Sequence, residues 1–157
     1  MMTYFAIAAV VGAGVVTGLL FAFSNFVMQA LAKLPNDQGM LAMQQINEKI
    51  INPIFVMFFL GTPVLCAIIG INAILALESP GSLSLLIGSV LYLAGPFGIT
   101  MLFNVPLNNR LAEVAMEDAD DNWPDYQIRW QRWNHLRTYV GILSVAMLSA
   151  GLISLSF

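Results

Sequence analysis

Charged side chains are scarce in this sequence: they make up 10% of its 157 residues, whereas hydrophobic residues make up 59%. A soluble domain usually carries about 25% charged residues, so this composition indicates a chain that folds in lipid. The chain has only six Lys and Arg residues, fewer than its Asp and Glu residues. It therefore lacks the basic excess that nucleic-acid binding needs, and that class is excluded.

Cysteine and histidine are almost absent, with Cys66 and His135 the only ones. One cysteine excludes an internal disulfide and a multi-cysteine metal site, and its apolar surroundings favour a small core residue. A bis-histidine haem would have to bridge two subunits or use a methionine, and a zinc or copper site lacks ligands in the same way. We therefore predict no metal site and no resident cofactor, and leave haem or quinone binding open.

Long apolar runs dominate what is present, and four of them can each supply the ~20 residues that cross a bilayer. The predicted spans are residues 5–32, 54–77, 83–103 and 138–157. All six Lys and Arg residues fall at one side of these spans, which predicts cytoplasmic polar loops, both termini outside and insertion in the plasma (inner) membrane. We predict one domain over residues 1–157. Its fold class is all-α: an integral membrane antiparallel four-helix bundle with short amphipathic helices on the cytoplasmic side.

The first span carries small and amide side chains on one helix face. Gly14 and Gly18 form a GxxxG pattern, which favours close packing against another helix in lipid. Asn25 and Gln29 continue this face, and buried amides in lipid need partners. We therefore expect both amides to point into the bundle.

The next segments carry local helix signals. Residues 38–51 read as an amphipathic helix with Asn47 on its apolar side and Glu48 outward, and Asn52-Pro53 then reads as a helix cap that begins the second span. The alternative is one continuous helix with a kink at this point. Within the third span, Gly95-Pro96 should bend or loosen the helix.

Two polar segments flank the membrane at the cytoplasmic side. In "NVPLNNRLAEV", residues 104–114, the asparagines are expected to end a helix; if the helix continues past Pro106 instead, Asn104 and Asn108 share a face. In "WQRWNHLRT", residues 130–138, aromatic and polar side chains cluster at the start of the fourth span. An interfacial aromatic belt, with Arg137 near lipid phosphates, is the simpler interpretation of Trp130 and of nearby Tyr126. The alternative is that the two segments line a polar pocket, since ionisable groups at membrane depth usually face a cavity.

Four stretches in this order, "FAFSNFVMQAL", "MQQINEKIINPIF", "NVPLNNRLA" and "WPDYQIRWQRWNHLRTYVG", resemble the anthrone oxygenase-like family of small four-span membrane proteins, formerly a domain of unknown function. The resemblance extends from about Gly12 to the last span. It implies a membrane oxidoreductase that oxidises an aromatic, polyketide-like or other lipophilic substrate with molecular oxygen, because fungal members convert anthrones to anthraquinones with no established cofactor. The positions that match the family pattern are Asn47, Asn52, Asn104, Pro106, Asn108, Trp130, Trp133, Asn134, His135 and Arg137.

This chemistry wants a base, donors that hold an oxyanion, and flat apolar walls. Histidine titrates near neutral pH, so we assign catalysis to His135 as base and to Arg137 as anion holder. The predicted substrate-binding residues are Asn25, Gln29, Asn47, Asn52, Asn104, Asn108, Trp130, Trp133 and Asn134, with Tyr126 as a further wall. The expected partners are the lipid bilayer and a small lipophilic ligand, and a homo-oligomer is one option for the assembly. The rival hypothesis is a non-catalytic membrane protein that binds a quinone, lipid or haem, or an accessory subunit.

Overall fold

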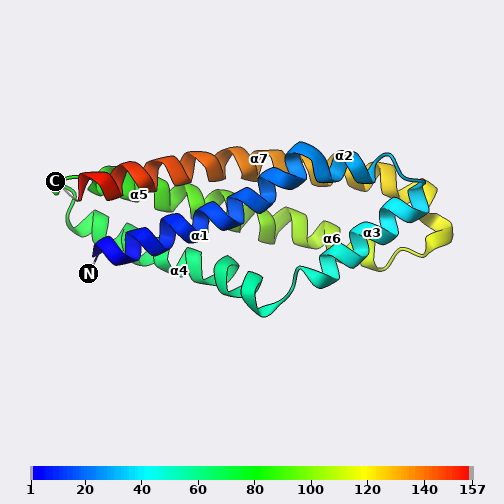
Figure 1. The fold of residues 1–157 in the computed structure, drawn as a ribbon, viewed down its shortest axis with the longest axis horizontal. Helices are drawn as coiled ribbons and strands as arrows, with labels where there is room; N and C mark the ends of the chain where they lie inside the picture. Colours follow the sequence, from blue (N-terminus) through cyan, green and yellow to red (C-terminus); the bar gives the residue numbers. More distant parts are fainter. Residues whose placement is uncertain (1, 156–157) are drawn as a thin grey trace.

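The computed structural model describes residues 2–155, and over them the chain forms four antiparallel helical rods, as predicted (Figure 1). The first rod comprises α1 (Met2–Ala22), η1 (Phe23–Val27) and α2 (Met28–Leu31). The second rod is α4 (Pro53–Leu75). The third comprises α5 (Ser82–Tyr92), η2 (Leu93–Asn104) and α6 (Val105–Ala112), and the fourth is α7 (Ala119–Ser154). The amphipathic helix α3 (Asn36–Lys49) and the single turn η3 (Met116–Asp118) complete the two longer connections.

Four helical runs are long and apolar enough to cross a membrane: Met2–Leu31, Pro53–Leu75, Ser82–Ala112 and Met116–Ser154. The third and fourth runs extend further toward the polar connections than the spans predicted from hydropathy. The end of the predicted fourth span, residues 156–157, lies outside the described residues. The protein is therefore an all-helical membrane protein whose third and fourth rods project beyond their most apolar parts.

The local signals around the second rod act as predicted. The side chain of Asn52 caps α4, accepting a hydrogen bond from the Phe55 amide at 3.1 Å, and Pro53 occupies the first turn. At the other end of α4, the turn into α5 places Gly81 at a φ of 78°, a left-handed conformation that glycine adopts without strain.

The third rod continues where an end was predicted. Pro96 lies inside η2, a segment whose turns are wider than those of an α-helix, and it supplies no N–H to the helical ladder. The prediction that the asparagines after residue 103 end the helix is wrong. Pro106 falls in the first turn of α6, a position that tolerates proline, and the helix runs on to Ala112.

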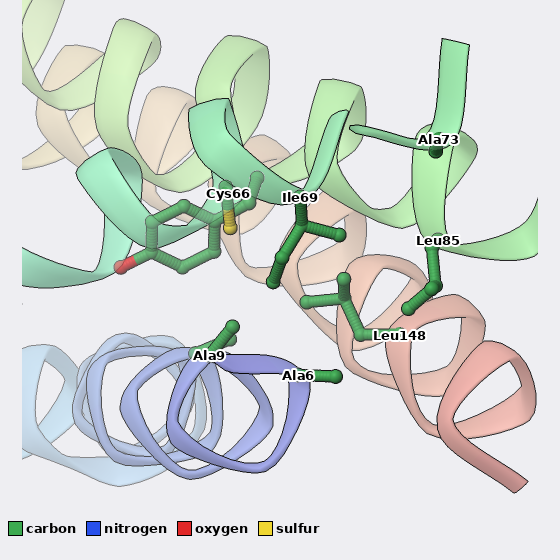
Figure 2. Packing of buried hydrophobic residues seen from close by; sticks show 9 residues of the cluster. Ala6, Ala9, Cys66, Ile69, Ala73, Leu85 and Leu148 are labelled. Carbon is green, nitrogen blue, oxygen red and sulfur yellow. The ribbon is translucent and has the colours of Figure 1, made fainter. Parts of the chain in front are cut away.

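The half of the bundle nearest the two chain termini packs around small side chains of α1 (Figure 1). Ala6 and Ala9 face Cys66 and Ile69 of α4, and Leu148 of α7 closes the cluster (Figure 2). All five side chains are inaccessible to solvent. Cys66 is therefore the small core residue that the sequence predicted.

The face of α1 that packs is not the predicted one. Gly14 and Gly18 are exposed, and a Cβ built on either meets nothing within 4 Å. Asn25 and Gln29 on the same face are exposed too, so the prediction that they point into the bundle is wrong. The close approach occurs at Gly12, where a Cβ would collide with α4. Glycine spacing alone did not distinguish this face from the neighbouring one.

Candidate functional site

A cavity of about 690 Å³ lies at the end of the bundle that carries the two longer connections. Its walls come from α3 and the first turns of α4 on one side, and from α1, η1, η2, α6 and α7 on the other. Most of the lining is apolar, including Val16, Leu20, Phe55 and Phe59. A cavity of this size is typical of small-molecule sites, which hold few polar groups among apolar walls.

Arg137 of α7 is the cation that lines the cavity, and its side chain is 5% exposed. Its Nε and Nη2 donate to Asn134 Oδ1 at 3.0 and 2.7 Å, and its Nη1 donates to Thr100 Oγ1 at 2.7 Å. The guanidinium lies over the Trp130 ring, 5.1 Å from its centroid. A guanidinium has five N–H donors, so two remain after these three bonds.

No carboxylate pairs with Arg137 among the residues that the structure describes. The ion pairs there are Lys49–Glu48 and Arg129–Asp125, and both lie at the surface. The buried guanidinium instead contacts the neutral oxygens of Asn134 and Thr100 and the face of the Trp130 ring. Arg137 is therefore a buried cation without an ion-pair partner among the described residues.

Asn134 holds the guanidinium and ties it to the first rod. Its side chain is fully buried, and its Nδ2 donates to Leu20 O at 3.0 Å and to Ser24 Oγ at 2.8 Å. Thr100, the other partner of Arg137, donates in turn to the carbonyl of Pro96 within η2. Segments of wide helical turns are frequent at functional sites, and here η1 and η2 both supply groups to the shell around Arg137.

Asn108 and Asn47 add amide donors to the lining. The Oδ1 of Asn108 accepts from Trp130 Nε1 at 2.8 Å and from the Tyr126 hydroxyl at 3.0 Å. Its side-chain Nδ2 donates no hydrogen bond to the other residues of the range 2–155. Asn47 lies beside Tyr126, and its Nδ2 is inaccessible to solvent. The donors of the lining without a partner in residues 2–155 therefore include the Nδ2 of Asn108 and two N–H groups of Arg137.

Trp130 and Tyr126 are core residues, at 3% and 5% exposure, and not members of an exposed interfacial belt. Asn104 is buried as well and donates to Trp130 O at 3.2 Å, behind the cavity wall. Trp133 instead stacks on Phe103, with centroids 3.8 Å apart, and is not part of the lining.

The remaining predicted site residues lie apart from Arg137. His135 is half-buried, has its ring 6.4 Å from that of Tyr139 and does not line the cavity. Asn52 caps α4 and borders a neighbouring hollow, while the exposed Asn25 and Gln29 line neither. The structure thus brings together Asn47, Asn108, Trp130 and Arg137 in the lining, with Asn134 directly behind.

The residues predicted from the sequence omit five polar residues of the lining: Gln44, Gln45, Glu48, Thr100 and Asn109. Thr100 follows Pro96 by one helical turn, which places its hydroxyl by the proline carbonyl. Glu48 was assigned to the outward face of its helix; it is exposed, yet it borders the cavity and is the carboxylate there. The four-residue separation of Pro96 and Thr100 could have predicted where the Thr100 hydroxyl lies. The position of Glu48 depends on how α3 packs against the bundle, which the sequence does not show.

Comparison with known proteins adds one finding. The family model described as anthrone oxygenase matches residues 54–147, which is more than half of the chain. No curated protein and no solved structure matches the chain. The matched region extends from α4 into α7 and contains Thr100, Asn108, Trp130, Asn134 and Arg137. The chain therefore belongs to the anthrone oxygenase family.

Proposed function

We propose that the protein is a membrane oxygenase that oxidises a flat, lipophilic aromatic ketone of the anthrone type with molecular oxygen, without a cofactor, in the cavity beside Arg137. The observation that carries this proposal is the guanidinium of Arg137, buried in a mostly apolar cavity with no carboxylate partner in the described chain. A buried unpaired charge costs several kcal/mol. A ligand that becomes an anion inside the cavity offsets that cost.

The anion of an anthrone fits this requirement. Removal of a proton from its ring methylene leaves the electrons of the C–H bond delocalised onto the carbonyl oxygen across the ring. The free donors of Arg137 and Asn108 then stabilise the oxygen that gains the charge. Each such preorganised donor is worth about 10²–10³-fold in rate.

The resulting electron-rich anion reacts with oxygen directly. It passes an electron to O₂, a C–O bond forms at the deprotonated carbon, and the peroxide takes up a proton. Loss of water from this hydroperoxide leaves a second carbonyl. The balance is one anthrone and one O₂ consumed for one anthraquinone and one water formed.

Two aromatic groups supply flat walls for such a ring system. Phe55 and Phe59 are stacked with centroids 5.4 Å apart, and Phe59 packs against Phe97. The Trp130 ring belongs to the cavity wall that also carries Arg137. A planar substrate between these walls would have its oxygen at the guanidinium.

Glu48 is the residue that we propose as the base. Its carboxylate borders the cavity and is exposed beside Lys49, so it can pass the proton to water. The role of His135 as base stays a prediction, which its place outside the lining does not favour. We further propose that the cavity end of the bundle is cytoplasmic, because all six Lys and Arg residues belong to that end.

Oxygen uptake by the purified protein in lipid nanodiscs tests the proposal. An oxygen electrode and the absorbance of anthraquinone should report one O₂ per anthrone, well above the rate in empty nanodiscs. A protein that only binds lipophiles would be stabilised against heat by anthrone but would take up no oxygen, and a haem protein would show a Soret band. Either result in place of anthrone-dependent uptake contradicts the proposal.

A further inference from the structure

A second, apolar hollow of about 390 Å³ adjoins the cavity on the surface between α1 and α4. Three side chains, Val16, Leu19 and Phe55, line both spaces. The outer hollow and the inner cavity are therefore separated by little more than these apolar side chains.

The hollow exists because α1 and α4 diverge. Their contact is tight at Gly12, where a Cβ would collide with the Thr62 side chain. Two turns further along each helix, Leu19 and Phe55 line the hollow instead. In Figure 1, α4 runs away from α1 toward its own first turn, where the chain arrives from α3.

The outer side of the hollow carries exposed apolar side chains. Val15 and Ile54, which line it but not the inner cavity, are 49% and 69% exposed, and the exposed cap residue Asn52 is the polar member of the lining. The inner cavity has a different border on α3 and α6, where the exposed polar residues are Gln45, Glu48 and Asn109. The site thus has an apolar side toward the bilayer and a polar side toward water.

We propose that the divergence of α1 and α4 is a lateral portal, through which an uncharged aromatic substrate dissolved in the bilayer reaches Arg137 past Phe55. The portal rests on the proposed function for the identity of its substrate. A neutral three-ring molecule concentrates in lipid because transfer of its apolar surface out of water is favourable. Once it is ionised beside Arg137, the same molecule is retained, since the apolar portal disfavours a charge.

Closing the portal with aromatic rings tests the inference. The variant Val15→Phe/Ile54→Phe fills the outer hollow from both helices without altering a residue that lines the cavity. The matched control is Ile7→Phe/Ile71→Phe, which changes one exposed residue on each of the same helices, away from the hollow. Each protein is assayed with anthrone in vesicles and with a ring-sulfonated, water-soluble anthrone.

The portal predicts a selective defect. The closed variant should lose at least about tenfold in kcat/KM for vesicle-borne anthrone and stay within about twofold for the sulfonated compound, which enters from the polar side. The control should stay within about twofold for both. Unchanged turnover of vesicle-borne anthrone, or an equal loss for both substrates, overturns the inference.

A binding measurement separates this inference from the proposed function. Anthraquinone supplied in vesicles should quench the fluorescence of Trp130, which lines the cavity, and the association rate should fall about tenfold in the closed variant. If the wild type oxidises no anthrone but this slowing is seen, the proposed function fails and the portal stands. If the wild type oxidises anthrone and the association rate is unchanged in the closed variant, the portal fails alone.

Discussion

Replacement of Arg137 by lysine keeps the charge but removes the geometry on which the proposed reaction depends. The guanidinium uses three donors on Asn134 and Thr100 and keeps two for a ligand. An ammonium group has three donors at one point and cannot bridge both partners while it also binds an oxyanion. Loss of one preorganised donor costs about 2.7–4 kcal/mol in the transition state. We therefore expect Arg137→Lys to lower kcat/KM for anthrone by about 10²–10³-fold.

The assay is anthrone-dependent oxygen uptake in nanodiscs, corrected for uncatalysed oxidation. Arg132→Lys is the matched control, because Arg132 is an exposed cation of the same helix that lies over Trp133 and not in the cavity. Its activity should remain within about twofold of the wild type. If Arg137→Lys folds, as judged by thermal unfolding, and retains activity within about threefold, the reasoning about the guanidinium is refuted.

Three further predictions concern packing, positioning and the base. Gly12→Ala should destabilise the protein by about 1–3 kcal/mol, because a methyl there collides with α4, whereas Gly14→Ala should be neutral or slightly stabilising; equal melting temperatures for the two variants would count against the packing. Asn134→Leu removes four hydrogen bonds and leaves a buried guanidinium without its main partner, so thermal unfolding should show a loss of about 3–5 kcal/mol, and an unchanged melting temperature would contradict the network. Glu48→Gln should lower kcat for anthrone at least about tenfold while His135→Ala changes it less than about threefold; the reverse pattern would return the role of base to His135.

The features that sequence predicted correctly depend on local chemistry. Apolar runs reveal membrane-crossing helices because lipid leaves few alternatives, and Asn52 caps α4 through contacts within a single turn. The helix is wider around Pro96, as predicted, and the proline ring leaves the helical ladder without one N–H donor there. The helical face that packs was not predictable in this way, since Gly14 and Gly12 differ only in what the neighbouring helix brings against them.

The site, too, combines residues whose positions follow from local helix geometry with residues whose positions depend on packing between helices. Asn134 and Arg137 are three residues apart and so about 60° apart around a helix, whereas His135 is about 160° from Arg137. Their closeness in sequence suggested a single cluster, yet α7 presents only the first two to the interior. A helical-wheel projection of α7 would have placed His135 on a different face from Asn134 and Arg137. The contribution of Glu48 required the docking of α3, which depends on contacts far apart in the chain.

The central claim is that the unpaired guanidinium of Arg137 stabilises an oxyanion in the cavity, and an oxygen-stable hydroxyanthraquinone reports on it directly. The phenol and phenolate forms of such a ligand absorb at different wavelengths. At a pH where the free ligand is the neutral phenol, we expect the ligand bound to the wild type to show the phenolate spectrum, and that bound to Arg137→Met to show the phenol spectrum. A wild-type complex with the spectrum of the neutral phenol would contradict the account.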